Sequence, residues 1–344
     1  MKVVAARRLP EEAVRVLEEA GAEVLQLPSR DNSIEWLAEA LRGADVLLAG
    51  FNPVTRDLID SGLPTLKLIV AMSSGTDHID VEYAEEAGVC VANQPEAIAF
   101  SVAEHALMLG LAAMRGLVSS HHWVVEGRWH GKGWPPWARG GLVRGSTLGV
   151  VGLGRIGSLV AFYSRMMGAG RILYWSRRRK PELEQVLALE PASLERLFRE
   201  SDLIIIALPK AQGTEGLVTI DHLRSMKRGA VLVNVGRGGI VREEDLARIL
   251  EERDDIVVAL DVFEEEPTPP NSRLIEVARK KPRQLVATPH HAGASPLSFK
   301  ATAILAARQV AFYIEKGEVW NPVNKACKQA RDIPGLWSWL YNTL

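Results

Sequence analysis

Three ionisable side chains of different chemical types each follow a short run of apolar, mostly β-branched residues. Arg237 comes shortly after one such run, Glu266 after another and His290 after a third. An imidazole exchanges protons near neutral pH, a hydrogen-bonded carboxylate stabilises its protonated form, and a guanidinium binds carboxylates and developing negative charge. Singly, each also fits an ordinary role as a surface turn, a helix cap or a satisfied polar group. Together, they would form an acid–base site with an anion-binding arginine.

The elements that must position these side chains alternate between short apolar runs and helical patterns along almost the whole chain. This alternation is typical of α/β proteins, in which helices cover parallel sheets. Strands are expected at residues 3–6, 23–27, 45–49, 66–71, 89–92, 147–151, 172–175, 203–207, 230–235, 256–260 and 284–287. Open sheets of this kind bind ligands at the carboxyl ends of their strands, where all three ionisable residues are expected.

The length of the chain predicts two domains, because 344 residues divide into units of about 150. An apolar helical pattern spans residues 98–125, and residues 127–141, rich in Gly, Trp and Pro, predict an arm or linker without a regular element. A long helical pattern at residues 296–316 follows the second set of strands and could return to the first domain. The predicted domains are residues 1–98 with 293–344, and residues 99–292.

Charge and hydropathy exclude several classes of partner. The 41 Lys and Arg residues nearly balance the 42 Asp and Glu residues, so nucleic acid or an anionic membrane is not expected as the main partner. The N-terminus lacks the pattern of a signal peptide. The most apolar stretch, residues 102–118, is interrupted by Glu104, His105 and Arg115 and predicts a buried or interfacial helix. We therefore expect a soluble, cytoplasmic protein.

Cysteines and the C-terminus add two smaller expectations. Cys90 and Cys327 have no metal-type spacing, so no zinc site is expected, and they allow at most one disulfide. Residues 331–344 carry closely spaced Leu, Trp and Tyr side chains, which would form an exposed apolar patch. This tail is expected to pack on its own subunit or on a partner.

A glycine-rich loop lies between the expected strand at residues 147–151 and an amphipathic helix. It reads G-x-G-x-x-G and consists of Gly152, Leu153, Gly154, Arg155, Ile156 and Gly157. In this setting the first glycine permits a tight turn, the second lets the backbone approach a pyrophosphate, and the third allows close packing of helix on strand. The helix N-terminus attracts the phosphate charge. The loop predicts a dinucleotide site, and no Lys-Ser or Lys-Thr pair completes a nucleotide-triphosphate loop.

The next strand, at residues 172–175, is followed by Ser176, Arg177 and Arg178 and has no carboxylate at its end. An acidic residue there accepts hydrogen bonds from the ribose hydroxyls of NAD, whereas serine and arginine bind a 2′-phosphate. We therefore predict that NADP(H) is preferred and NAD(H) is possible. The alternative is a solvated run of charges after a strand.

The motifs together resemble the D-isomer-specific 2-hydroxyacid dehydrogenase family over about residues 1–325. Within that family the chain is most similar to the glyoxylate/hydroxypyruvate reductases. The resemblance rests on residues 73–80, 102–104, 152–157, 234–238, 261–267 and 288–293.

This resemblance implies two Rossmann-like or flavodoxin-like domains with a cleft between them, a homodimer, and a catalytic set of Arg237, Glu266 and His290. The discontinuous domain would bind substrate, and the continuous domain would bind the dinucleotide. Substrate contacts are implied at Asn52, Ser74, Gly75, Arg237 and His290. Further dinucleotide contacts are implied at Val102, Leu208, Pro209, Thr214, Val235, Gly236, Asp261 and Gly293.

The expected reaction is the reduction of glyoxylate, hydroxypyruvate or a similar small 2-keto acid to the D-2-hydroxy acid, with His290 as general acid. One alternative is a dehydrogenase for another acid, such as 3-phosphoglycerate or formate. Another is a dinucleotide-sensing protein similar to the transcriptional corepressors related to this family.

Overall fold

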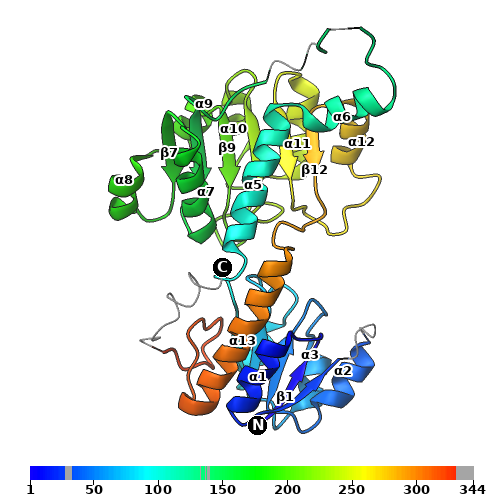
Figure 1. Ribbon diagram of the computed structural model, residues 1–344, viewed down its shortest axis with the longest axis vertical. Helices are drawn as coiled ribbons and strands as arrows, with labels where there is room; N and C mark the ends of the chain where they lie inside the picture. The colour runs from blue at the N-terminus through cyan, green and yellow to red at the C-terminus, as the bar shows by residue number, and fades with distance from the viewer. Residues whose placement is uncertain (28–32, 132, 136, 138–139, 331–344) are drawn as a thin grey trace. The chain divides into compact units, whose positions relative to one another are not determined.

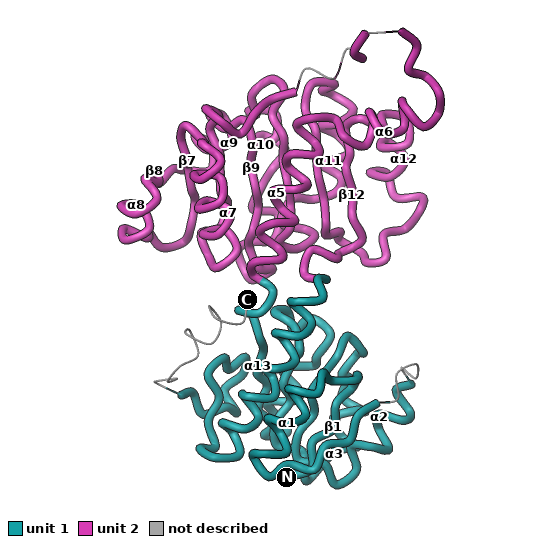
Figure 2. Tube along the Cα trace, viewed as in Figure 1, with its two compact units in different colours: residues 1–98, 294–344 teal, residues 99–293 magenta. Residues whose placement is uncertain are grey.

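The computed structural model describes residues 1–27, 33–131, 133–135, 137 and 140–330 (Figure 1). The chain divides into two compact units, which we call unit 1 (residues 1–98 and 294–344) and unit 2 (residues 99–293) (Figure 2). The prediction for the tail at residues 331–344 concerns residues outside the described part of the chain.

Unit 1 is built on a five-stranded parallel sheet with the strand order β2-β1-β3-β4-β5. Its strands are β1 (Lys2–Ala5), β2 (Glu23–Gln26), β3 (Val46–Ala49), β4 (Leu68–Ala71) and β5 (Cys90–Ala92). Its helices are α1 (Glu11–Glu19), α2 (Ile34–Leu41), α3 (Arg56–Gly62), α4 (Val81–Glu86) and α13 (Pro296–Lys316).

Helices cover both faces of this sheet because successive strand residues point to opposite sides. Val3 and Ala5 pack with residues of α1 and α13, which lie side by side (Figure 1). Val4 and Ala6 pack with α2, α3 and α4 on the other face. The strands are therefore buried on both sides, as their nearly continuous apolar sequences predict.

The chain segment after α13 returns to β5 and is joined to it covalently. Cys90 and Cys327 form a disulfide, with Cα atoms 4.6 Å apart. Nearby, the Asn324 side chain accepts a hydrogen bond from the Val91 amide (3.1 Å) and donates one to the Val89 carbonyl (2.9 Å). Unit 1 is thus closed by contacts between remote parts of the sequence.

Unit 2 contains a seven-stranded parallel sheet with the order β12-β11-β10-β9-β6-β7-β8. Its strands are β6 (Thr147–Val151), β7 (Arg171–Trp175), β8 (Leu189–Pro191), β9 (Leu203–Ile206), β10 (Val231–Asn234), β11 (Val257–Leu260) and β12 (Leu285–Ala287). Its helices are α5 (Ala99–Met114), α6 (Leu117–Val125), α7 (Arg155–Met166), α8 (Pro181–Leu187), α9 (Leu194–Glu200), α10 (Ile220–Ser225), α11 (Glu243–Glu252) and α12 (Arg273–Lys280).

The strand order of this sheet reverses between β6 and β9, which is where doubly wound folds bind their ligands. Residues of α9, α10, α11 and α12 form the core on one face. On the other, α5 packs on α7 and on β10, β11 and β12 (Figure 1). The predicted class of two parallel-sheet α/β domains is confirmed.

Two details of the predicted elements are wrong. The single helical pattern at residues 98–125 forms two helices, because Gly116 adopts a left-handed conformation (φ 59°) between α5 and α6. The strand β8 was not predicted.

No single helix in the described ranges is long and apolar enough to cross a membrane, and α5 with α6 meets that test only as a pair bent by 60°.

Candidate active site

The three predicted catalytic residues follow three neighbouring strands of unit 2. Arg237 comes after β10, Glu266 after β11 and His290 after β12, and these strands are adjacent in the sheet. Because parallel strands end at the same edge, their following loops meet there. The site is therefore assembled from three loops on one rigid sheet.

A direct hydrogen bond joins the predicted acid–base pair. The Nδ1 atom of His290 contacts Oε2 of Glu266, and Oε1 of the same carboxylate accepts a hydrogen bond from the Phe263 amide at 2.9 Å. Since the carboxylate is an acceptor, Nδ1 is the donor and Nε2 is the ring nitrogen left for a substrate. The His290 side chain is 45% exposed, so a ligand can reach it.

Asn234, the last residue of β10, shapes the turn that carries Arg237. Its Oδ1 accepts a hydrogen bond from the Gly236 amide (3.0 Å), and its Nδ2 donates to the Arg237 carbonyl (2.9 Å). A Cβ atom at Gly238 would lie 1.8 Å from the Phe263 carbonyl oxygen, so only glycine fits there. The turn of Arg237 thus packs directly on the segment that also binds Glu266, which in turn binds His290.

Asp261 holds the turn on which His290 lies. His290 has a positive φ of 48°, which is unfavourable for a residue other than glycine. The next two residues donate their amides to the Asp261 carboxylate, His291 to Oδ1 (3.0 Å) and Ala292 to Oδ2 (2.9 Å). In addition, Ser101 on α5 donates its hydroxyl to the Ala292 carbonyl (2.8 Å). These contacts stabilise the strained conformation of His290.

The Asp261 carboxylate is charged although it is buried. Burial raises its pKa, but the nearby His105 side chain, the Thr288 hydroxyl and the two backbone amides together hold the pKa below its usual range. A fixed negative charge therefore lies beside the turn of His290.

The glycine loop fits the phosphates of a dinucleotide. Gly152 has a φ of 101°, and a Cβ there would lie 2.7 Å from the Ala207 carbonyl after β9, so the turn from β6 into α7 requires glycine. A Cβ at Gly157 would lie 2.0 Å from the Gly152 carbonyl, which shows how closely α7 approaches the loop. A Cβ at Gly154 would meet no described atom within 4 Å, so the backbone there is open to a ligand.

The predicted 2′-phosphate residues Arg177 and Arg178 differ in their bonding from their neighbour Arg179, which was not predicted to bind the phosphate. Arg179 forms an ion pair with Glu184 (2.5 Å), and Glu184 also accepts a hydrogen bond from the Tyr174 hydroxyl. The positive charge of Arg179 is therefore already paired. Arg177 and Arg178 are exposed and pair with no residue in the described part of the chain. These two cations are therefore available after β7.

The remaining predicted dinucleotide contacts all lie in unit 2, at strand ends or on α5. Thr214 has a structural role, since its hydroxyl donates to the Pro209 carbonyl (2.9 Å) and accepts the Ala211 amide (2.8 Å). It thereby orders the loop after β9. The predicted dinucleotide contacts in unit 2 referred to here are Val102, Leu208, Pro209, Thr214, Val235, Gly236, Asp261 and Gly293.

The other predicted substrate residues lie in unit 1, at the carboxyl ends of β3 and β4. Asn52 follows β3, and Ser74 and Gly75 follow β4. The Ser74 carbonyl accepts a hydrogen bond from the Asn93 side chain (2.6 Å), and the Gly75 carbonyl accepts one from the Ser73 hydroxyl (2.7 Å). This loop is therefore ordered within its own unit.

Sequence reasoning missed His105, which it treated only as a polar interruption of an apolar helix. The side chain is 11% exposed and lies 3.5 Å from Asp261 Oδ1. The one available signal was a titratable residue in the buried stretch of a helix that packs against the strands carrying the site.

A glycine loop at the switch point of a parallel sheet, with an acid–base pair at neighbouring strand ends, defines a dinucleotide-dependent oxidoreductase. A family model for the NAD binding domain of D-isomer specific 2-hydroxyacid dehydrogenases matches residues 107–292. The chain belongs to this family, and it is an NAD(P)-dependent oxidoreductase.

Its relatives include archaeal glyoxylate reductases. The chain is 35% identical to one from Thermococcus kodakarensis over 321 residues, which covers 92% of this chain and 94% of that protein. It is 38% identical to one from Aeropyrum pernix over 309 residues, covering 88% and 89%. A crystal structure of an NADPH-dependent glyoxylate/hydroxypyruvate reductase from Sinorhizobium meliloti matches with a TM-score of 0.77 at 27% identity, covering 96% and 99%.

Proposed function

We propose that this protein reduces glyoxylate or hydroxypyruvate to the D-2-hydroxy acid, with His290 as the general acid and NADPH as the preferred coenzyme. The proposal rests on one observation above all, the hydrogen bond between Glu266 and His290 beside the turn of Arg237. The named activities of the archaeal and bacterial relatives support the choice of substrate.

Each side chain has a separate task in this reaction. The nicotinamide, when bound, supplies a hydride to the carbonyl carbon. The Nε2 atom of His290 donates a proton to the carbonyl oxygen, while Glu266 keeps the ring oriented and favours its protonated form. Arg237 binds the substrate carboxylate and stabilises negative charge on the oxygen. Asn52 and the backbone amides of Ser74 and Gly75 bind substrate from unit 1.

Asp261 binds the carboxamide of the coenzyme in this proposal. Its Oδ2 atom accepts one hydrogen bond, from the Ala292 amide, and a carboxylate oxygen has room for a second. The preference for NADPH is supported by Ser176 and by Arg177 and Arg178, which have no partner among the described residues.

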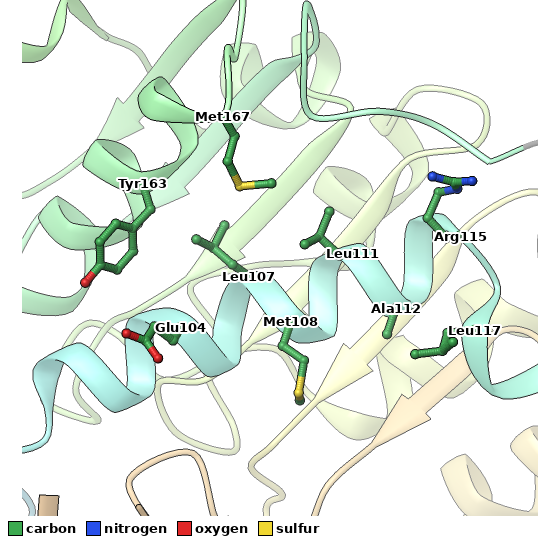
Figure 3. Close-up of a pocket in the computed structure, with 9 residues that line it drawn as sticks. All are labelled: Glu104, Leu107, Met108, Leu111, Ala112, Arg115, Leu117, Tyr163 and Met167. Carbon is green, nitrogen blue, oxygen red and sulfur yellow. The ribbon is translucent and has the colours of Figure 1, made fainter. Parts of the chain in front are cut away.

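The homodimer is part of the proposal and would bury a groove on unit 2. Met108 and Leu117, both in its lining, are 47% and 59% exposed. Apolar side chains of the groove lie between Glu104, in the first half of α5, and Arg115, just beyond the end of α5 (Figure 3). Under a two-fold axis, Glu104 of one copy would face Arg115 of the other, so the groove is complementary to itself.

A cytoplasmic location also remains a prediction, and the disulfide weighs against a strongly reducing compartment.

The activity is tested with a panel of glyoxylate, hydroxypyruvate, pyruvate and 3-phosphohydroxypyruvate, each with NADPH and NADH. We expect the highest kcat/KM for glyoxylate or hydroxypyruvate with NADPH, and a D-configured product from hydroxypyruvate. A higher value for 3-phosphohydroxypyruvate would support the phosphoglycerate alternative. Tight dinucleotide binding without any turnover would support the sensor, and equal efficiency with NADH would remove the coenzyme preference.

The dimer is tested by charge reversal at the two ends of the groove. Glu104→Arg and Arg115→Glu each place like charges opposite each other, so each single variant should shift toward a monomer in analytical ultracentrifugation. The double variant restores opposite charges and should restore the dimer. Unchanged assembly of both single variants would place the interface elsewhere.

A further inference from the structure

A chain of hydrogen bonds leads from α5 to the turn that carries the proposed general acid. His105 on α5 places its Nε2 atom 3.1 Å from the Thr288 hydroxyl oxygen. That oxygen lies 2.6 Å from Asp261 Oδ1. Thr288 follows β12 and Asp261 follows β11, so the chain connects a helix with two strand ends of unit 2.

The direction of these hydrogen bonds follows from counting protons. The Asp261 carboxylate is ionised and can only accept, and Thr288 has a single hydroxyl proton. At 2.6 Å the hydroxyl must donate to the carboxylate, since two acceptors would repel each other. The hydroxyl oxygen is then an acceptor, so Nε2 of His105 carries a proton and donates it to Thr288. Each bond in the chain polarises the next.

This series of hydrogen bonds ends at the backbone next to His290. Asp261 accepts hydrogen bonds from the amides of the two residues that follow His290, namely His291 and Ala292. His290 itself has a φ of 48°, a conformation that persists only where the surroundings enforce it. The orientation of its imidazole therefore depends on the placement of the Asp261 carboxylate.

We propose that His105 and Thr288 are positioning residues for catalysis, which fix the Asp261 carboxylate and through it the turn that presents His290 to the substrate. The inference rests on the proposed role of His290. Neither residue touches the reacting atoms. Their contribution is to keep Nε2 of His290 in line with the carbonyl oxygen, where a small displacement is costly.

The same cluster has the composition of a metal site, but its hydrogen bonds favour the positioning role. The ligand atoms of His105, Asp261 and His291 all lie within 4.8 Å of one another. A metal bound beside Asp261 would need an unprotonated Nε2 on His105, whereas the hydrogen bond to Thr288 requires a proton on that nitrogen. Asp261 also already accepts three hydrogen bonds, so metal binding would dismantle the support of the His290 turn.

The test compares substitutions that remove a hydrogen-bonding group with substitutions that keep it. Thr288→Val removes the hydroxyl at nearly constant volume, and Thr288→Ser retains it. His105→Phe removes the donor, and His105→Gln retains an N–H at similar reach. We expect Thr288→Val and His105→Phe to lower kcat at saturating coenzyme about 10-fold, the low end for groups that orient an active residue, with KM for the 2-keto acid changed less than about 2-fold. Ser and Gln should restore most of kcat.

A double variant tests whether the two residues act in one chain. His105→Phe with Thr288→Val should be no slower than Thr288→Val alone, because the effects of residues in one network are not additive. Multiplied losses would overturn the proposal, as would equal kcat in the Val and Ser variants or in the Phe and Gln variants.

A second His–Thr pair in unit 2 provides the matched control. On α10, the Nδ1 atom of His222 lies 3.0 Å from the Thr219 hydroxyl, in a helix cap that includes no predicted site residue. His222→Phe should lower Tm without changing kcat. A loss of kcat in His105→Phe no larger than in His222→Phe would reduce His105 to a structural role and overturn the inference. His290→Gln separates the two claims, since an active His290→Gln enzyme contradicts the proposed function itself.

Discussion

The strand ends of unit 2 carry ionisable groups with hydrogen-bond partners, whereas those of unit 1 carry buried polar atoms without them. In unit 2, Glu266 binds His290, and Asp261 accepts three hydrogen bonds. In unit 1, the Nη2 atom of Arg7 and the Nε2 atom of His78 are buried with no hydrogen-bond partner among the described residues. Burial lowers the pKa of both side chains.

This difference between the two units corresponds to two requirements of a catalytic site, which are fixed orientation of the reacting groups and binding of a ligand. Groups that must hold one orientation during proton transfer are fixed by bonds within unit 2, and this preorganisation lowers the barrier. A buried polar atom without a partner costs free energy, and a bound ligand can recover that cost. The contrast therefore predicts that changes at the hydrogen-bonded acid–base groups of unit 2 act mainly on kcat, and that changes in unit 1 act on substrate binding or on stability.

The largest effect is expected from the acid–base pair. His290→Gln removes the proposed proton donor and should lower kcat roughly 100-fold or more, the usual range for a lost general acid. Steady-state kinetics at saturating NADPH measure the loss. Asn52→Ala in unit 1 should instead raise KM for the 2-keto acid with a smaller change in kcat. His121→Gln, an exposed change on α6, serves as the control, and a His290→Gln enzyme as active as this control would contradict the comparison.

A smaller effect is expected at the end of β7, where the arginines differ in their partners. Arg177→Ala and Arg178→Ala should each raise KM for NADPH about 10-fold, because a hydrogen bond to a charged group contributes about 1.5–3 kcal/mol. KM for NADH should stay nearly constant, since it lacks the 2′-phosphate. Arg179→Ala is the matched control, because its guanidinium already pairs with Glu184. An equal effect of all three variants on NADPH would show general charge attraction instead of a 2′-phosphate site.

The sequence predicted the sheets well because their strands are buried on both faces and have continuous apolar runs. The strand at residues 147–151 and the helix at residues 296–316 were predicted with the bounds that the structure has. The strand β8 escaped prediction because it has only three residues and ends in proline at the sheet edge. The break at Gly116 was hidden within an apolar pattern that continues on both sides of it.

The position of the site could be predicted, but its internal bonds could not. Arg237, Glu266 and His290 follow strands, and parallel topology alone brings strand ends to one edge. By contrast, the hydrogen bond between His105 and Thr288 joins residues 183 apart in the chain, and it depends on where α5 crosses the sheet. Helix crossing is set by packing that no local pattern encodes. The buried Nε2 atom of His78, which has no partner among the described residues, is likewise a property of the fold.

The smallest expected effect tests the unit 1 side of the comparison, through the pH dependence of stability. Burial lowers the pKa of His78, although Asp77 and a hydrogen bond to the Gly50 backbone act in the opposite direction. An unfolded histidine has a pKa of about 6.5, so below that pH the unfolded chain binds more protons than the folded one. The contribution of His78 to the free energy of unfolding is therefore fully present above about pH 6.5. It decreases as the pH falls through the lowered pKa of the folded state.

His78→Gln removes this proton linkage. Between pH 7.5 and 5.5, the decrease in Tm measured by calorimetry should be smaller in the variant than in the wild type, by about 2 °C at most for a domain of this size. His121→Gln removes an exposed histidine from α6 and should leave the slope of the wild type unchanged. Parallel curves for His78→Gln and the wild type would mean that folding does not lower the pKa of His78, and the contrast between the two units would then be limited to Arg7.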